Sequence, residues 1–273
     1  MRIFADMHNH TTFSDGKLSP AERAVMLKDK GAKAFAITDH DTVGGIEEGI
    51  EIAKKLNMAF SPAIEISTYT FREIHVLGYN IKYNDPDFLE TLDLIKSFRT
   101  DRNVKLYNRL VELGIKLDLD PTEQGIGRVH FANAMVKAGY SVDVNDAFDT
   151  YLGNGKKAYV TAKRLTPLTA VSCIVKAGGV PVLAHPKAYL IDKKLDLLIE
   201  GLKTYGLKGL EVCYPSHNET DEKTLSAVAK KFGLIPTAGS DFHNPSTSDP
   251  HNKHGFTPLM EESDLNKLLP KKI

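Results

Sequence analysis

The 273-residue sequence has no long apolar run, no excess of either charge and only two cysteines. The absence of a run of about 18 apolar residues argues against a membrane span. The N-terminus turns polar too early for a secretory leader. Lysine plus arginine and aspartate plus glutamate each number 35, so a broad basic face for long nucleic acid is not expected. These absences predict a globular protein that binds neither a membrane nor long nucleic acid, and we expect it to be cytoplasmic and monomeric.

The two cysteines and the ten histidines point in different directions. Cys173 and Cys213 lie in apolar stretches far apart in sequence. We interpret them as buried thiols of a reducing compartment, with a disulfide as the less favoured alternative. Several histidines, in contrast, stand next to aspartate, so we look to them for the chemistry.

Short β-branched or apolar runs alternate with amphipathic segments along most of the chain. The predicted strands are Arg2–Met7, Ala34–Thr38, Ala59–Glu65, Ile74–Tyr79, Val180–Ala184, Gly209–Cys213 and Ile235–Gly239. The predicted helices between them are Pro20–Lys30, Gly45–Leu56, Thr166–Ala177, Asp196–Tyr205 and Thr220–Phe232. This alternation is typical of an α/β sheet or barrel.

One stretch, residues 85–163, contains helical patterns but no convincing strand. A long helix is predicted from Asp85 to Gly114, followed by shorter helices near Val129–Lys137 and Val144–Tyr151. We interpret this stretch as a helical subdomain inserted into a barrel formed by residues 1–84 and 164–273, and we expect it to cover the active site.

Nine histidines and carboxylates follow the predicted strands. They are His8, His10, Asp15, His40, Glu65, His75, His185, Asp241 and His243. In α/β barrels and sheets, ligands bind at the carboxyl ends of the strands, so these side chains should converge on one rim. His75 is the exception, because Glu65–Tyr79 resembles a hairpin. If its turn is centred near Thr70, Glu65 and His75 lie directly opposite each other, with Cβ atoms about 5 Å apart.

Imidazole and carboxylate together suit divalent Zn, Mn or Fe. His8 and His10, two residues apart on an extended segment, point the same way and can chelate one ion. Nine ligands exceed one tetrahedral shell, which predicts a multinuclear cluster with Glu65 as a bridging carboxylate. The alternative is that the histidines are separate core or helix-capping residues, which is the usual role of a lone histidine.

In combination these motifs resemble those of the polymerase-and-histidinol-phosphatase (PHP) family. The motifs are His8-x-His10, Thr38-Asp39-His40-Asp41, Ala184-His185-Pro186 and Ser240-Asp241-Phe242-His243. The resemblance implies a distorted (β/α)7 barrel with three divalent ions, which are Mn, Zn or Fe. It implies that His8, His10, Glu65 and Asp241 hold the first ion. It assigns Glu65, His75 and His185 to the second ion, and Asp15, His40 and His243 to the third.

Asp15 stands where many family members have histidine, which resembles the subgroup that hydrolyses AMP and nucleoside 3′,5′-bisphosphates. The insert, from Gly127-Arg128 to Ala158-Tyr159-Val160, is similar to that of the same subgroup. Two departures, Val129 for a usual proline and Asn244 for a usual glycine, affect substrate preference more than the metal site.

Candidate substrate contacts are residues that could meet a phosphate dianion. Arg128 stands at a predicted helix N-terminus, where a guanidinium adds to free backbone N–H groups, and His130 follows on the same turn. His217 follows a strand on the expected rim. Arg102 lies close to the apolar stripe of the long helix, where snorkelling into solvent is the simpler explanation. His251 and His254 are expected in a surface loop.

The resulting hypothesis is a metal-dependent phosphatase of small nucleotides, with the nucleotide and phosphate as its partners. A hydroxide bridging two metal ions would attack phosphorus in line, while Arg128 neutralises charge on the phosphoryl oxygens. The leaving oxygen would take its proton from metal-bound water, His217 or His130. Three alternatives stay open: a histidinol-phosphate phosphatase, a 5′-3′ exoribonuclease acting on short oligonucleotides, and a non-enzymatic metal- or nucleotide-binding module.

Overall fold

The computed structural model describes residues 1–270 except 71–72, 124, 162, 190–193 and 247–255. The chain divides into two compact units. The first combines Met1–Leu92 with Leu165–Ile273, and the second is Asp93–Arg164. The boundaries fall inside the long helix α3 (Pro86–Glu112) and just before β-bridged Leu165. Each unit is described separately below.

The first unit is built on one eight-stranded sheet in the order β7-β6-β5-β4-β3-β2-β1-β8. Its strands are β1 (Arg2–Asp6), β2 (Ala34–Ile37), β3 (Ala59–Tyr69), β4 (Glu73–Tyr79), β5 (Val180–Leu183), β6 (Gly209–Cys213), β7 (Ile235–Ala238) and β8 (Leu259–Glu261). Strands β1, β2 and β3 run parallel, as do β5, β6 and β7, while β4 runs antiparallel between the two sets. Strand β8 adds an antiparallel edge to β1.

The sheet curls into a nearly closed barrel because the segments that follow β1 and β7 also meet. The Met7 N–H donates to the carbonyl of Ala238 over 3.1 Å, and Asn9 bridges to Phe242 in parallel. The predicted distorted α/β barrel is therefore confirmed. Parallel strands joined through this seam bring the motif after β7 next to the motif after β1.

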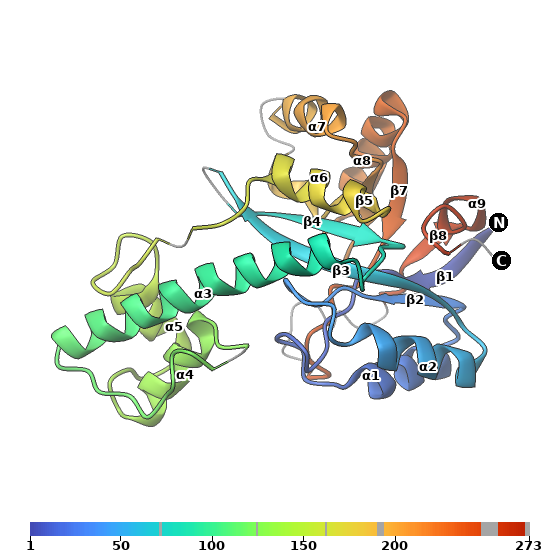
Figure 1. Cartoon of the computed structure of the whole chain (residues 1–273). Helices are drawn as coiled ribbons and strands as arrows, with labels where there is room; N and C mark the ends of the chain where they lie inside the picture. Colours follow the sequence, from blue (N-terminus) through green and yellow to red (C-terminus); the bar gives the residue numbers. More distant parts are fainter. Residues whose placement is uncertain (71–72, 124, 162, 190–193, 247–255, 271–273) are drawn as a thin grey trace. The chain divides into compact units, whose positions relative to one another are not determined.

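Helices lie outside the strands, much as the sequence predicts. They are α1 (Pro20–Asp29), α2 (Ile46–Leu56), α6 (Pro167–Lys176), α7 (Lys194–Thr204), α8 (Glu219–Phe232) and α9 (Glu262–Leu265), with a 3-10 turn at Pro186–Tyr189. Figure 1 shows α1 and α2 side by side next to β1–β3, and α6–α8 beside β4–β7. Ser19 and Thr166 cap α1 and α6 and precede Pro20 and Pro167, the combination that favours a helix start.

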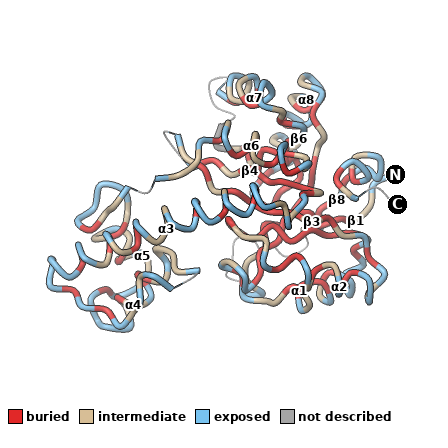
Figure 2. Tube along the Cα trace, viewed as in Figure 1, coloured by how far each residue is buried: buried red, intermediate tan, exposed pale blue. Residues whose placement is uncertain are grey.

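The core of this unit lies between the strands. Small and medium side chains such as Ala5, Ala36 and Val182 pack there around Tyr79, all with no exposed surface. Figure 2 shows the strands as buried and the outer faces of the helices as exposed. A rigid, densely packed barrel of this kind holds the residues at its strand ends in fixed positions.

Two expectations about the strands are wrong, and one strand was not predicted. Strand β3 continues to Tyr69 rather than ending at Glu65, because the antiparallel pairing with β4 extends as far as Tyr69. Within that hairpin Glu65 pairs with Leu77, and His75 pairs with Ser67. Strand β8 has no predicted counterpart. Cys213 is buried as expected, but Cys173 is only half-buried; both thiols are free.

The second unit is helical and has a core of its own. After α3 it contains α4 (Arg128–Lys137), α5 (Val144–Ala147) and a π-helical turn at Phe148–Leu152. Leu106, Phe131 and Leu152 are fully buried in its core. None of the helices in the described part of the chain is long and apolar enough to span a membrane.

Candidate metal centre

The structure gathers all nine predicted ligands on one rim of the barrel unit. His8 and His10 follow β1, His40 follows β2, His185 follows β5, and Asp241 and His243 follow β7. Glu65 and His75 lie within the β3–β4 hairpin, and Asp15 lies in the loop before α1. Eight of the nine side chains form three overlapping groups, and within each group the ligand atoms lie within 4.8 Å of one another. The groups are His8, His10, Glu65 and Asp241; His40, Glu65 and His75; and His10, Asp15, His40 and His243.

Glu65 stands at the centre and uses its two oxygens for different partners. Oε1 lies 3.0 Å from Nδ1 of His75 and 3.2 Å from Nε2 of His185. Oε2 lies 3.1 Å from Nε2 of His10 and 3.1 Å from Nδ1 of His40. Its side chain is completely buried. A carboxylate with a separate set of imidazoles on each oxygen has the arrangement of a bridging ligand between two ions.

His75 reaches Glu65 although the two residues are not direct cross-strand partners. They are diagonal neighbours, because β3 and β4 pair Ser67 with His75 and Glu65 with Leu77. Side chains at diagonal positions on one face lie within reach when they are long. Glu65 and His75 are therefore close together as expected, although the register of the hairpin differs from the predicted one.

Asp241 completes the first group. Its Oδ1 lies 3.0 Å from Nε2 of His10 and 3.2 Å from Nε2 of His8. Nε2 of His8 also lies 3.3 Å from Oε2 of Glu65. Two imidazole nitrogens and two carboxylate oxygens of four buried residues thus lie close together, and four such donors are a set that zinc and similar divalent ions accept.

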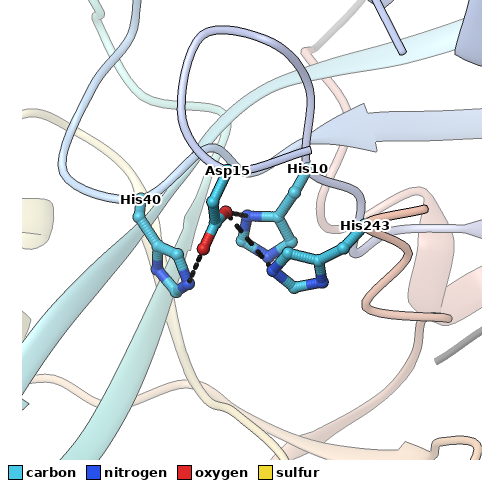
Figure 3. Close-up of side chains that lie close together, drawn as sticks. All are labelled: His10, Asp15, His40 and His243. Carbon is cyan, nitrogen blue, oxygen red and sulfur yellow. Dashed lines mark ion pairs between the residues drawn. The ribbon is translucent and has the colours of Figure 1, made fainter. Parts of the chain in front are cut away.

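Figure 3 shows the Asp15 carboxylate facing the rings of His10, His40 and His243. Oδ1 lies 3.3 Å from Nε2 of His243 and 3.7 Å from Nδ1 of His10, and Oδ2 lies 3.9 Å from Nε2 of His40. Partial burial raises the pKa of the Asp15 carboxyl, but the neighbouring imidazoles, His243 foremost, lower it far more. Asp15 is therefore an anion in this position.

The groups differ from the expected ligand sets in three residues. His10 belongs to the group around Asp15 as well as to the first group. His40 belongs to two groups, since Nδ1 faces Glu65 and Nε2 faces Asp15. His185 was expected beside His75, and it contacts the same oxygen of Glu65 without belonging to a group.

Several nitrogen and oxygen atoms that could bind a metal ion are buried without a hydrogen-bond partner in the described part of the chain. They are His8 Nε2, His10 Nδ1 and Nε2, and Glu65 Oε2. Unsatisfied buried polar atoms cost roughly 1–3 kcal/mol each, so a protein rarely keeps four of them close together. Imidazole and carboxylate atoms left unsatisfied and aimed at each other fit divalent ions between them.

Mutual attraction keeps the carboxylates of the centre ionised. Burial raises the pKa of Glu65, but the imidazoles of His8 and His75 lower it well below its usual value. Burial likewise raises the pKa of Asp241, and His8 and His10 lower it well below its usual value. Both oxygen ligands are therefore negatively charged at neutral pH and attract cations.

The pKa values of the imidazoles shift in different directions, although the same carboxylates lie nearby. Burial lowers the pKa of His10, but Asp241 and Glu65 outweigh it and raise the pKa to about 10. Burial also lowers the pKa of His75, and neighbouring carboxylates raise it to about 10. For His40, burial prevails and lowers the pKa to about 3. Without ions, protons on His10 and His75 thus supply the positive charge that the carboxylates attract.

The strand ends at this rim also have unusual backbone conformations. Asp41, His185 and Asp241 have positive φ angles of 55°, 27° and 52°. Such conformations are strained for residues other than glycine and concentrate at functional sites. Here they turn the chain sharply after β2, β5 and β7, where the ligands are placed.

Sequence reasoning missed two residues that form hydrogen bonds with predicted ligands. Glu211, in the middle of β6, accepts a 3.0 Å hydrogen bond from Nδ1 of His8. The hydroxyl of Tyr214 donates to Oδ2 of Asp241 over 2.8 Å. A signal for Glu211 exists, because it is the one charged residue in the apolar run Gly209–Cys213.

His217 lies in the barrel unit, one aromatic ring from the ligands. Its ring centroid is 5.1 Å from that of Tyr214, which is 5.4 Å from that of His185. Nδ1 of His217 donates to the carbonyl of Val212 over 2.8 Å. The buried Nε2 is then the unprotonated nitrogen of the neutral ring, and burial lowers the pKa of His217.

The other predicted substrate residues lie in the helical unit. Arg128 begins α4, as predicted, and its Nη2 donates to the carbonyl of Val160 over 2.9 Å. The half-buried His130 accepts a 3.0 Å hydrogen bond from the Gly127 N–H on Nδ1, which leaves Nε2 as its N–H donor. Arg102 is 7% exposed, so it does not snorkel into solvent. His251 and His254 lie outside the described residues.

An α/β barrel with histidines and carboxylates gathered at its strand ends fits a metal-dependent hydrolase, because active sites of such barrels lie at the strand ends and bound ions activate water for hydrolysis. Comparison with known proteins identifies the family. The sequence pattern of the PHP domain matches residues 6–133. The chain is 34% identical to a 5′-3′ exoribonuclease of Haemophilus influenzae over 246 residues, which is 88% of this chain and 90% of that protein.

Two further relatives agree with this result. A 3′,5′-nucleoside bisphosphate phosphatase of Chromobacterium violaceum is 32% identical over 248 residues, covering 88% of this chain and 87% of that protein. A solved structure described as a metal-dependent phosphoesterase, from Bifidobacterium adolescentis, superposes with a TM-score of 0.79 at 25% identity, covering 97% of this chain and 94% of that chain. The chain belongs to the PHP family, and it is a hydrolase of phosphate esters.

Proposed function

We propose that this chain is a phosphomonoesterase of small nucleotides, acting on AMP or nucleoside 3′,5′-bisphosphates with three divalent ions. The observation that carries the proposal is the division of the Glu65 carboxylate between two sets of imidazoles, with a third group around Asp15. A relative that is 32% identical over 88% of this chain is a 3′,5′-nucleoside bisphosphate phosphatase. The reaction takes one water and one monoester to inorganic phosphate and an alcohol.

The ligand sets of the proposed centre are those given by the resemblance. His8, His10, Glu65 and Asp241 would hold the first ion, Glu65, His75 and His185 the second, and Asp15, His40 and His243 the third. When bound, divalent ions lower the pKa of coordinated water toward about 7 and neutralise charge on phosphoryl oxygens. Mn, Zn and Fe all suit this donor set.

Arg128 and His130 are the proposed phosphate contacts of the helical unit, which would cover the site as an insertion spanning residues 85–163. A guanidinium offers paired donors to a phosphate, and the first turn of a helix adds backbone N–H groups. His130 has Nε2–H available, because its Nδ1 accepts from Gly127. Arg102 would serve as a further contact.

His217 would act on protons rather than on phosphate charge. Its neutral ring presents an unprotonated Nε2, since Nδ1–H is bound to the Val212 carbonyl. This atom can accept a proton from water or a substrate hydroxyl. His130 has the opposite tautomer, with its proton on Nε2, so we propose it as the donor of a proton to the leaving oxygen.

The test is phosphate release by one purified preparation loaded in turn with Mn, Zn and Fe. The substrates are AMP, adenosine 3′,5′-bisphosphate, histidinol phosphate and a short RNA with a 5′-phosphate. The proposal expects the highest kcat/KM for a mononucleotide. A higher value for histidinol phosphate would contradict it, and absence of hydrolysis with all three metals would favour a non-enzymatic binding module.

The contact assigned to Arg128 has a matched control in the same unit. Arg128→Ala removes a side chain that donates to the carbonyl of Val160, and Arg109→Ala removes one that donates to the carbonyl of Lys157 over 2.8 Å. A phosphate contact predicts a higher KM for Arg128→Ala only. Equal effects would assign both arginines to the fold.

A 5′-3′ exoribonuclease of short oligonucleotides is the second candidate. It is favoured by the 34% identity to the Haemophilus influenzae enzyme of that name. The same centre would serve, but the attacked phosphate is then a diester that links two nucleotides, and water cleaves it to a mononucleotide and a shortened RNA. The net charge of zero favours the mononucleotide, because long polymers are bound mainly through neutralised phosphates. Release of mononucleotides from the 5′-phosphorylated RNA, faster than phosphate release from AMP, would establish the second candidate.

A further inference from the structure

Glu211 is a buried carboxylate outside the three ligand groups. It lies in the middle of β6 and is 0% exposed. A buried carboxylate is strongly destabilising unless hydrogen bonds satisfy it. Both of its oxygens are used. Oε1 faces Nδ1 of His8 at 3.0 Å, and Oε2 accepts from the backbone N–H of His185 over 2.8 Å.

The contact with His8 decides which ring nitrogen faces the ligand cage. An ionised carboxylate only accepts hydrogen bonds, so Nδ1 of His8 must carry the proton. Nε2, 3.2 Å from Oδ1 of Asp241 and 3.3 Å from Oε2 of Glu65, is then the nitrogen that can bind an ion. Partners of this kind hold the tautomer and ring orientation of metal-binding histidines.

The contact with His185 acts on the backbone instead. His185 has a φ of 27°, a strained conformation for a residue with a side chain. The hydrogen bond from its N–H to Glu211 restrains this turn after β5. The turn aims Nε2 of His185 at Oε1 of Glu65, at 3.2 Å.

Close packing leaves this arrangement little freedom. A Cβ atom at Gly239, the residue directly after β7, would lie 2.9 Å from Oε1 of Glu211 and 2.2 Å from Cβ of His8. Glycine is therefore required where β7 passes the contact between Glu211 and His8. The Glu211 carboxylate is therefore closely packed on the side of residue 239.

We propose that Glu211 is a positioning residue of the metal centre, which sets the tautomer of His8 and the backbone of His185 at the same time. The two histidines belong to the sets proposed for the first and second ion, so one carboxylate aligns a ligand of each. The inference rests on the metal centre of the proposed function and is independent of the substrate.

A glutamine cannot replace this carboxylate although it has the same shape. Both partners, the His8 Nδ1–H and the His185 N–H, are donors, and an amide has only one oxygen to accept. If the amide oxygen takes the His185 N–H, the amide nitrogen faces His8 and favours a proton on Nε2, the nitrogen meant for the ion. Aspartate is shorter but keeps two acceptor oxygens.

The experiment titrates Mn and Zn into metal-free wild-type protein, Glu211→Gln, Glu211→Asp and the control Thr237→Val. Thr237 is the register partner of Glu211 on β7 and is also buried, so its loss measures a general disturbance of the barrel. We expect Glu211→Gln to bind metal about 10- to 100-fold more weakly, Glu211→Asp to be less affected, and Thr237→Val to match the wild type. Circular dichroism and thermal unfolding check that each variant folds.

Ring ¹⁵N spectra of the zinc-loaded proteins give a second measurement. The proposal expects an Nδ1–H signal for His8 in the wild type and its loss or shift in Glu211→Gln. Wild-type metal affinity in Glu211→Gln, or weaker binding in Glu211→Asp than in Glu211→Gln, would overturn it, as would an equal loss in Thr237→Val. A wild-type protein that binds metal but hydrolyses no nucleotide would refute the proposed function alone.

Discussion

The hydroxyl of Tyr214 donates a 2.8 Å hydrogen bond to Oδ2 of Asp241, while the other oxygen of that carboxylate faces the histidines. Asp241 thereby presents one oxygen to the cage and has the other one occupied. A hydroxyl in this position restricts the carboxylate to monodentate use. Burial and the nearby Asp241 raise the pKa of Tyr214, so its hydroxyl keeps its proton at all ordinary pH values.

Tyr214→Phe tests this relationship. The variant keeps the ring between His185 and His217 but loses the hydrogen bond, leaving Oδ2 of Asp241 without that donor. Hydrogen bonds to charged groups contribute roughly 1.5–3 kcal/mol, so we expect metal binding about 10-fold weaker, with activity recovering in excess metal. The measurement is activity as a function of free metal concentration. Tyr205→Phe, at an exposed site, is the control, and an unchanged metal dependence in Tyr214→Phe would refute the role.

Asp241→Asn should lose both bound metal and most of the hydrolytic activity. The change removes the negative charge that faces His8 and His10 while keeping the shape. We expect a loss of metal content and a fall in kcat/KM of at least about 100-fold, since the amide is a poor ligand for divalent ions. Metal analysis and phosphate release measure both. Asp196→Asn, which breaks only a surface pair with Lys231, should behave as the wild type, and full activity of Asp241→Asn would contradict the assigned centre.

Metal affinity should increase with pH up to about 10. In the metal-free protein the carboxylates raise the pKa of His10 and of His75 to about 10, so both rings hold protons at neutral pH. A bound ion must displace these protons, which makes binding weaker as pH falls below 10. Titration calorimetry in buffers of different ionisation enthalpy at pH 7 should therefore show net proton release. Proton uptake on binding would contradict this prediction.

Asp39→Asn should weaken the Asp15 end of the centre. The buried Asp39 carboxylate accepts hydrogen bonds from the Thr11 N–H at 2.7 Å, from the Thr11 hydroxyl at 2.6 Å and from the Ser14 hydroxyl at 2.6 Å. These bonds hold the loop that carries Asp15. We expect the free energy of unfolding to fall by roughly 1–3 kcal/mol. We also expect the variant to lose one bound ion before the others. Chemical unfolding and metal stoichiometry measure this, and simultaneous loss of all ions would refute a local effect.

Most of the barrel could be predicted because each buried strand is a short β-branched or apolar run next to an amphipathic helix. The ligands could be predicted because polar residues at strand ends are otherwise hard to explain. The register of the hairpin formed by β3 and β4 could not be predicted. The segment around Thr70 has no glycine, proline or asparagine to mark a turn, so nothing local sets which residues pair. Glu211 was missed for another reason: its partners come from β1 and β5, and only the closed sheet brings them to β6.

Two glycine-to-alanine substitutions should have opposite effects on the stability of the protein. At Gly239 an added Cβ would lie 2.2 Å from Cβ of His8, closer than side-chain atoms can approach, so β1 and β7 must separate beside the ligands. We expect Gly239→Ala to destabilise the protein by about 1–3 kcal/mol and to lower its metal content. At Gly201, within α7, no described atom lies within 4 Å of such a Cβ, and alanine is the better helix former, so Gly201→Ala should stabilise by up to about 1 kcal/mol. Thermal unfolding and metal analysis of both variants check this, and a Gly239→Ala protein with wild-type stability and metal content would show that the seam between β1 and β7 can yield without disturbing His8.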